Sequence, residues 1–149
     1  MRKNNSGQSF IELIAALLIV SMSLLALVSL VIRSLANTTF ARNKTLATSY
    51  AQQSLEWLRG ERDADWQTFY GRTNGSWCIV TLSWNTGGSH SGACGTNDVI
   101  PATPFRRTIT FTRVNTSTVN ATSTVTWSDG NGSHQSVATT TFTNWKGNP

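Results

Sequence analysis

The stretch that decides the fold is residues 12–32, ELIAALLIVSMSLLALVSLVI, whose only charged residue is the first. Residues 13–32 are twenty consecutive residues without a charge. At about 1.5 Å per residue, a helix of this length spans roughly 30 Å, the thickness of the hydrocarbon core of a bilayer. The stretch therefore predicts a membrane-spanning helix near the N-terminus.

Glu12 is the lone carboxylate beside this apolar run. An ionised carboxylate costs on the order of 2.5–3.5 kcal/mol at the centre of a bilayer, and less near the end of a helix. Ionisable groups in this setting are rare and usually pair with a partner, so they mark functional sites. Glu12 is therefore the first candidate for a functional residue.

The sequence GQSFIE at residues 7–12 resembles the processing signal of type IV prepilins and type II secretion pseudopilins. In that family a prepilin peptidase removes a short basic leader after its Gly, and the new N-terminus is methylated. A Glu stands fifth in the mature chain. The resemblance implies cleavage after Gly7, a modified N-terminus at Gln8 and an assembly role for Glu12. Gln8 departs from the pattern, because Phe or Met is commoner there.

Two alternatives stay open for the N-terminus. One is a secretory signal peptide with cleavage after Ala36, although its apolar core would exceed the usual length of roughly 7–15 residues. The other is a plain membrane anchor in which Glu12 is incidental. In all three interpretations the basic residues Arg2 and Lys3 hold the N-terminus in the cytoplasm and leave the rest outside.

The helical pattern continues beyond the apolar run. No Gly or Pro interrupts residues 8–59, and an apolar stripe recurs there at helical spacings. The stripe consists of Phe40, Ala47, Ala51, Leu55 and Leu58. Arg59 and Gly60 supply a cationic last turn and a C-terminal glycine, so we expect the helix to end there.

From Trp77 onward the apolar period changes to two, which predicts strands. The expected strands are residues 78–84, 107–114, 123–128 and 135–145, with the last two joined by a turn at 129–132. The Asp-Gly-Asn-Gly sequence of that turn tolerates the positive φ of a tight hairpin. Residues 87–95 and 101–104 are expected to be loops.

These patterns predict an α+β fold, a long N-terminal helix packed on a small antiparallel β-sheet, which is also the pilin fold that the resemblance implies. The expected organisation is a leader at 1–7, a transmembrane and assembly helix at 8–32, its amphipathic half at 33–59 and an exported β-rich part at 60–149. Charged residues make up only 13 % of the chain. The formal charge of +5 falls to +3 if a leader containing Arg2 and Lys3 is removed.

Cys78 and Cys94 lie in the expected exported part. In an oxidising compartment they would form a disulfide that closes a loop of about fifteen residues, a constraint of roughly 3 kcal/mol. A zinc site with His90 is the alternative, but Cys78, His90 and Cys94 supply three ligands without a CxxC pair, so no metal is expected. Free thiols stay open if the cell exterior lacks oxidising machinery.

The sequence predicts no enzyme and no cofactor. Nucleophilic catalysis needs a nucleophile, a base and an orienting group. The two histidines, His90 and His134, lie in a polar loop and beside a turn. Neither is placed by sequence beside the carboxylates Glu61, Asp63 and Asp65, which could hold a cation but lack EF-hand spacing. A phosphate-binding glycine loop and an HExxH motif are absent from the sequence.

Residues 51–66, AQQSLEWLRGERDADW, resemble a helix-end pattern of one branch of minor pilins. There Arg62 and Asp63 would fix a turn and Trp66 would pack under it. Many major pilins carry a helix-breaking Pro in the membrane segment where this chain has Ser29, so a more continuous helix is expected.

The resemblance implies a structural subunit, a minor pilin or pseudopilin of a pilus-like or secretion-like fibre. Its partners would be other subunits, a prepilin peptidase and an assembly platform. It would lie in the cytoplasmic membrane before assembly and in a cell-surface fibre afterwards.

A DNA-binding competence pilin is the second expectation, because aromatic rings and cations bind single strands. Arg106 and Arg107 are the basic pair on which it depends. The six Trp residues fall at positions compatible with a core, which favours burial over base stacking. They are Trp57, Trp66, Trp77, Trp84, Trp127 and Trp145.

Overall fold

The computed structural model describes residues 6–130 and 132–147, with side chains from Phe10 onward. Arg2 and Lys3 of the expected leader lie outside the described residues. The chain divides into two compact units, residues 1–42 and 43–149. Helix α1 (Ser6–Ala64) begins in the first unit and ends in the second.

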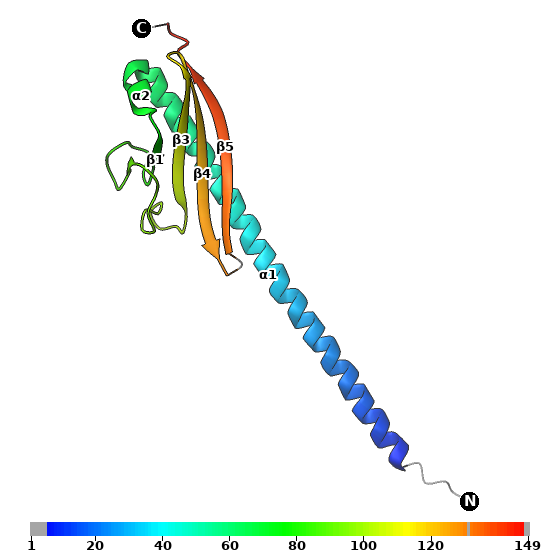
Figure 1. Cartoon of the computed structure of the whole chain (residues 1–149). Coiled ribbons are helices and arrows are strands. Elements are labelled where there is room, and N and C mark those ends of the chain that lie inside the picture. Colours follow the sequence, from blue (N-terminus) through cyan, green and yellow to red (C-terminus); the bar gives the residue numbers. More distant parts are fainter. Residues whose placement is uncertain (1–5, 131, 148–149) are drawn as a thin grey trace, which may run out of the picture. The chain divides into compact units, whose positions relative to one another are not determined.

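The second unit contains a five-stranded antiparallel sheet with the strand order β2-β1-β3-β4-β5 (Figure 1). The strands are β1 (Ser76–Cys78), β2 (His90–Ser91), β3 (Arg106–Asn115), β4 (Thr118–Asp129) and β5 (Gly132–Thr143). Every second residue of β4 is buried, and these residues form one face of the sheet. The predicted α+β class, a long helix with a small antiparallel sheet, is confirmed.

The part of α1 in the second unit covers the sheet with the stripe that the sequence predicted. Ala47, Ala51 and Leu58 are fully buried. Ser54 is equally buried, and its Oγ lies 2.7 Å from the Oγ of Ser123 on β4. Small residues at these positions let the helix backbone approach the sheet closely. Phe40, the first residue of the predicted stripe, belongs to the first unit and is exposed.

The prediction that α1 ends at Gly60 is wrong, because the helix continues to Ala64. A glycine inside a helix costs only about 0.5–1 kcal/mol relative to alanine. The turn after Gly60 is held by a hydrogen bond of 2.5 Å from Trp84 Nε1 to Glu61 Oε2. The helix stops where the backbone of Asp65 becomes extended.

A short helix, α2 (Trp66–Arg72), follows and was not predicted. The carboxylate of Asp65 caps it by accepting hydrogen bonds from the amides of Gln67 and Thr68, at 3.1 and 3.2 Å. Trp66 is buried directly behind this cap, as the sequence led us to expect.

The predicted strand at 78–84 is also wrong, because β1 ends at Cys78. Beyond it the chain turns around Ser89, whose hydroxyl oxygen accepts from the amides of Val80 and Thr81, both at 3.1 Å. The same hydroxyl donates to the Thr81 carbonyl at 2.9 Å. One buried side chain thus satisfies backbone groups that would otherwise need a neighbouring strand.

The predicted hairpin is confirmed and is longer than expected. β4 and β5 pair from Thr118↔Thr143 to Asp129↔Gly132. Gly132 has φ of 123°, a conformation that favours glycine at the turn. The predicted strand at 107–114 corresponds to β3.

Candidate functional site

In the first unit, residues 13–32 form an apolar surface that nothing in that unit covers. Every side chain from Phe10 to Arg42 is exposed. Large aliphatic residues such as Ile11, Leu25 and Met22 keep about 70 % of their surface accessible. By length and composition, α1 contains a segment able to cross a membrane.

Hydroxyl groups within this apolar surface are satisfied inside the helix. The hydroxyls of Ser21, Ser23 and Ser29 donate to the carbonyls four residues earlier, at 2.7, 2.8 and 3.0 Å. Thr38 repeats the pattern at 2.9 Å. A hydroxyl bonded to its own helix needs no water, so these residues are compatible with an apolar environment.

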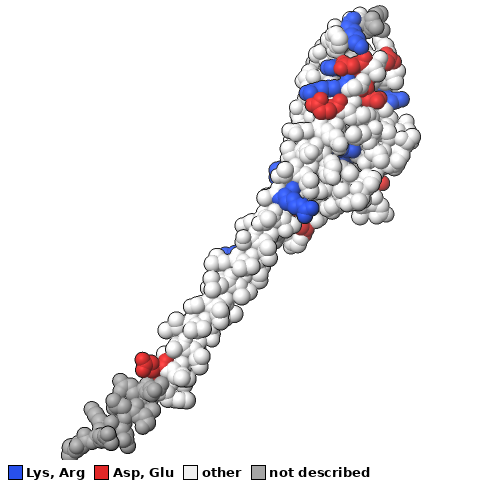
Figure 2. All heavy atoms as spheres, turned by 180° about the vertical axis from the view of Figure 1, so that it is seen from behind, with Lys and Arg blue, Asp and Glu red and all other residues white. Residues whose placement is uncertain are grey.

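Glu12 is the single acidic residue beside this surface, and Figure 2 shows one acidic group near the start of the described part of the helix. Among the side chains described from Phe10 onward, none forms a hydrogen bond or ion pair with Glu12. Gly7 and Gln8 lie in the first turn of α1, where only the backbone is described. The carboxylate is thus placed on an apolar helix without a partner among those side chains.

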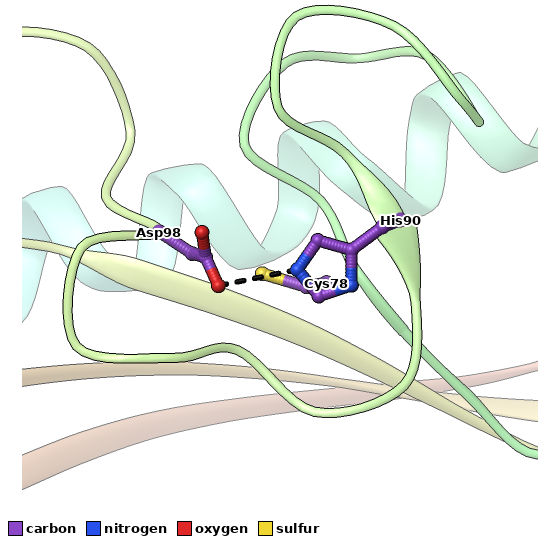
Figure 3. Close-up of side chains that lie close together, drawn as sticks. All are labelled: Cys78, His90 and Asp98. Atoms are coloured by element: carbon purple, nitrogen blue, oxygen red, sulfur yellow. Dashed lines mark hydrogen bonds and ion pairs between the residues drawn. The ribbon is translucent and has the colours of Figure 1, made fainter.

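The second candidate site surrounds the two cysteines. Cys78 and Cys94 form a disulfide with S–S 2.00 Å and Cα–Cα 4.8 Å. Cys78 is fully buried at the end of β1 and pairs across the strands with His90 on β2. Figure 3 shows the side chains of Cys78, His90 and Asp98 converging from β1, β2 and the loop that follows β2.

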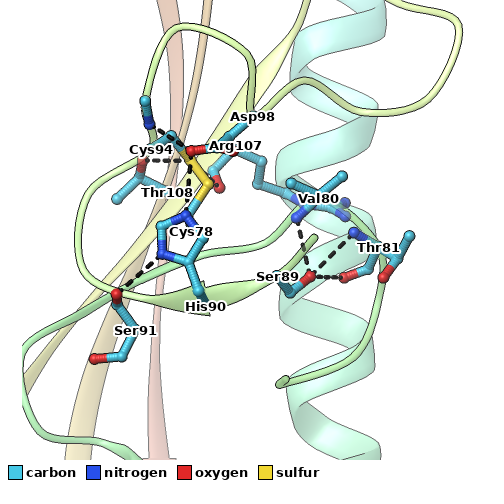
Figure 4. Close-up of polar contacts among 11 residues, drawn as sticks. Cys78, Val80, Thr81, Ser89, His90, Ser91, Cys94, Asp98, Arg107 and Thr108 are labelled. Atoms are coloured by element: carbon cyan, nitrogen blue, oxygen red, sulfur yellow. Dashed lines mark hydrogen bonds and ion pairs between the residues drawn. A yellow bond between two sulfur atoms is a disulfide. The ribbon is translucent and has the colours of Figure 1, made fainter. Parts of the chain in front are cut away.

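His90 contacts an acceptor with each ring nitrogen. Nδ1 lies 3.0 Å from the carbonyl oxygen of Ser91, and Nε2 lies 3.1 Å from Oδ2 of Asp98 (Figure 4). The Ser91 carbonyl and the Asp98 carboxylate raise the pKa of His90 above its ordinary value. The Gly95 amide, which donates to Oδ2 at 2.6 Å, and His90 lower the pKa of Asp98.

Asp98 is the residue that sequence reasoning missed. It follows a polar loop, and no local pattern marks it as a neighbour of Cys78 or His90. The strand pairing and the loop after β2 bring these three residues together, with their ligating atoms all within 4.8 Å of one another. His90, which the sequence places in a polar loop, lies on β2 and is half-buried in this cluster.

The basic pair that supported DNA binding does not form an exposed pair. Arg107 is 2 % exposed, and its guanidinium donates to the carbonyls of Ile79 and Tyr50 at 3.1 and 3.2 Å. Burial lowers the pKa of Arg107 to about 10. A cation bound to backbone carbonyls inside the fold is not available to a phosphate, so this argument for DNA binding is lost.

The acidic residues at the end of α1 each have a structural contact. Glu61 accepts from Trp84, and Asp65 caps α2. Asp63 Oδ1 accepts from Trp145 Nε1 at 3.0 Å, and this hydrogen bond lowers the pKa of Asp63. These contacts leave no convergent set of carboxylates for the cation considered from the sequence.

Trp145 does not belong to the core. It follows the end of β5 and is 65 % exposed, contrary to the prediction from its spacing. Four of the other tryptophans are buried, and Trp57 is half-buried.

Comparisons of the chain with known protein families, with curated proteins and with solved structures find no match.

Proposed function

We propose that this chain is a structural subunit of a type IV pilus-like or type II secretion-like fibre and assembles through the N-terminal part of α1. The observation that carries the proposal is Glu12, a lone carboxylate at the start of an exposed apolar helix. The preceding Gly7 and Gln8 have the spacing of a prepilin cleavage site relative to it.

The proposed assembly conserves apolar burial. Before assembly the segment 13–32 lies in the cytoplasmic membrane, and after assembly it packs against the same segment of neighbouring subunits. Its surface loses lipid contacts and gains protein contacts, while its hydroxyls remain bonded within the helix. The change of environment therefore requires no new partner for the serines.

Glu12 supplies the axial register in this proposal. Cleavage after Gly7 creates a free amine at Gln8, and Glu12 of one subunit pairs with that amine in a neighbour. A slipped register leaves a carboxylate unpaired in an apolar fibre core, and removing one partner of such a pair costs several kcal/mol, about 3–5. The pair thus penalises incorrect registers more strongly than it stabilises the correct one.

The second unit is the part that the fibre would display outside the cell. Its disulfide is typical of proteins that mature in oxidising compartments. Its surface is rich in Thr, Ser and Asn hydroxyl and amide groups, which suits contact with water. In this function the unit contributes contacts between subunits and exposure to the medium, and no catalytic step is assigned to it.

N-terminal processing is the first test. The full chain is produced in cells that contain a prepilin peptidase, and the mature N-terminus is determined by mass spectrometry. We expect a chain that begins at Gln8, an uncut chain for Gly7→Leu, and normal processing for the neighbouring control Ser9→Ala. A mature chain that begins at Met1 or Asn37 would contradict the proposal.

Assembly is the second test, and it compares two glutamates. Glu12→Gln keeps size and removes the charge, while Glu56→Gln makes the same change at an exposed position of the second unit. We expect Glu12→Gln to reduce the amount of subunit in sheared fibres about tenfold or more, since about 1.4 kcal/mol already changes a population tenfold. Glu56→Gln should assemble normally. Equal assembly of both variants would remove the role of Glu12.

A further inference from the structure

The Cys78–Cys94 disulfide lies beside two other groups that commonly bind zinc. Sγ of Cys78, a ring nitrogen of His90 and a carboxylate oxygen of Asp98 lie within 4.8 Å of one another. Cys94 supplies the second sulfur, because it is bonded to Cys78. The sequence suggests Cys78, His90 and Cys94 as possible ligands, and the fold adds the carboxylate of Asp98.

We propose that reduction of the Cys78–Cys94 disulfide creates a tetrahedral zinc site formed by Cys78, Cys94, His90 and Asp98. Two thiolates, one imidazole and one carboxylate are four ligands of the types that Zn²⁺ binds. This site is independent of the fibre function, because all four residues belong to the second unit.

The spacing of the ligands is close to that of a zinc site. Zinc binds sulfur at about 2.3 Å and nitrogen or oxygen at about 2.0–2.2 Å, so ligand atoms around it lie roughly 3.3–3.8 Å apart. Nε2 of His90 and Oδ2 of Asp98 are already 3.1 Å apart. The ligating atoms of Cys78, His90 and Asp98 lie within 4.8 Å of one another, so the largest separation has to shorten by about 1 Å to reach zinc geometry. Cys94 lies in a loop between Gly92 and Gly95, outside the regular strands.

The contacts of His90 indicate that this position is built for a cation. The Ser91 carbonyl and the Asp98 carboxylate are both acceptors, and a neutral imidazole has only one N–H to donate. A zinc ion placed between Nε2 of His90 and Oδ2 of Asp98 would bind both atoms, while Nδ1–H donates to the Ser91 carbonyl.

Groups around the ligands favour the same arrangement. Zinc-bound histidines almost always donate the N–H of the second ring nitrogen to a carboxylate, a backbone carbonyl or water, and Nδ1 of His90 lies 3.0 Å from the carbonyl oxygen of Ser91. The hydroxyl of Thr108 lies 3.4 Å from Sγ of Cys94 and donates toward it. The Gly95 amide donates to Asp98 and orients the carboxylate.

The redox step balances with a dithiol or phosphine as the reductant. The disulfide accepts two electrons and two protons to give the thiols of Cys78 and Cys94. A dithiol supplies both and becomes a disulfide, whereas a phosphine reacts together with one water molecule, which supplies the two protons and the oxygen of the phosphine oxide. Zinc then replaces the two thiol protons and is bound by Nε2 of a neutral His90 imidazole. The chain is made with both cysteines as thiols, so zinc can also bind before the disulfide forms.

The experiment uses the full chain in detergent micelles, oxidised or reduced with a phosphine that is removed without air. Each form is titrated with Co²⁺ and then with Zn²⁺. We expect the reduced chain to bind one metal ion, with thiolate-to-Co²⁺ charge-transfer absorption that Zn²⁺ abolishes. The oxidised chain should show no such absorption. Binding of Co²⁺ with this absorption by the oxidised chain, or no binding by the reduced chain, would overturn the proposal.

Variants separate a four-ligand site from a simple dithiol. His90→Ala and Asp98→Asn keep both thiols, and each should weaken zinc binding by the reduced chain about tenfold or more. His134→Ala is the matched control, because Nε2 of His134 lies 2.9 Å from Oδ1 of Asp129 in a pair without cysteines. It should bind zinc as the unchanged chain does. Unchanged binding in both His90→Ala and Asp98→Asn would show that the dithiol alone binds zinc and would refute the site.

Circular dichroism of the reduced chain covers the case in which reduction loosens the fold. If the near-ultraviolet signal is lost, zinc should restore it, because binding to the folded site stabilises the fold. A signal that zinc does not restore would count against the proposal.

Discussion

A pair of buried serines joins α1 to β4 and gives a sharp test of the packing between helix and sheet. Ser54 and Ser123 are both fully buried, with Oγ atoms 2.7 Å apart. Ser54 Oγ also donates to the Ala51 carbonyl at 2.7 Å. Since Ser54 has a single hydroxyl proton, Ser123 must be the donor of the bond between the two side chains.

Because Ser123 is the donor and Ser54 the acceptor, the two single substitutions should lower the free energy of unfolding by different amounts. Ser123→Ala removes one hydrogen bond and leaves Ser54 bonded to Ala51, a cost of about 0.5–1.5 kcal/mol in the free energy of unfolding. Ser54→Ala leaves the buried hydroxyl of Ser123 without its acceptor, a cost of about 1–3 kcal/mol. The double variant has no unpaired hydroxyl, so it should cost no more than Ser54→Ala alone.

The assay is equilibrium unfolding of the full chain in detergent micelles, followed by the fluorescence of its buried tryptophans. Ser128 and Ser133 form the matched control, because their Oγ atoms lie 3.0 Å apart on the exposed end of the hairpin. Ser128→Ala should change stability by no more than about 0.5 kcal/mol. Equal costs for Ser54→Ala and Ser123→Ala that add in the double variant would refute the inferred direction and the coupling.

Three further predictions concern the second unit. Replacing Cys78 and Cys94 by Ser should lower the free energy of unfolding by about 3 kcal/mol and make it insensitive to reductant, because the disulfide closes a loop with a sequence separation of 16. Ala51→Leu should cost about 1–3 kcal/mol by denaturant unfolding, because Ala51 is fully buried, whereas Gln53→Leu on the exposed face should be nearly neutral. The pKa of Asp65 is lowered, chiefly by the hydroxyl and amide of Thr68. The stabilisation by this carboxylate is therefore full above its unfolded pKa of about 3.9 and is lost as pH falls through the lower folded value. Asp65→Ala should remove the part of the acid dependence of unfolding that this carboxylate contributes. If NMR titration of the folded chain gives Asp65 an ordinary pKa, the prediction is wrong.

The sequence predicted the elements whose signals are local. The buried stripe at Ala47, Ala51 and Leu58 follows from helical spacing, and the β4–β5 hairpin follows from alternation around a glycine-rich turn. The helix end predicted at Gly60 was wrong. The turn after Gly60 is held by the hydrogen bond from Trp84 to Glu61, and Trp84 is far from Glu61 in the sequence. Propensity rules cannot include such a contact.

The errors around the site have the same physical origin. Arg107 belongs to an alternating strand with a basic neighbour, which looks like an exposed pair, but carbonyls of Ile79 and Tyr50 satisfy its charge in the interior. No local sequence pattern marks Asp98 as part of a site. Its proximity to Cys78 and His90 depends on the pairing of β1 with β2. Side chains whose partners are distant in sequence are those that pattern reasoning places wrongly.

The two units are stabilised by different means, and this difference has a consequence for function. The second unit has a buried core, a paired sheet and a disulfide, all within its own residues. The described side chains of the first unit are exposed within that unit, and by length and composition α1 contains a segment able to cross a membrane. Substitutions such as Ser54→Ala should therefore change unfolding of the second unit without changing membrane insertion. Glu12→Gln should change assembly without changing that unfolding, and fibre yield measured beside denaturant midpoints for both variants would reveal any coupling between the two.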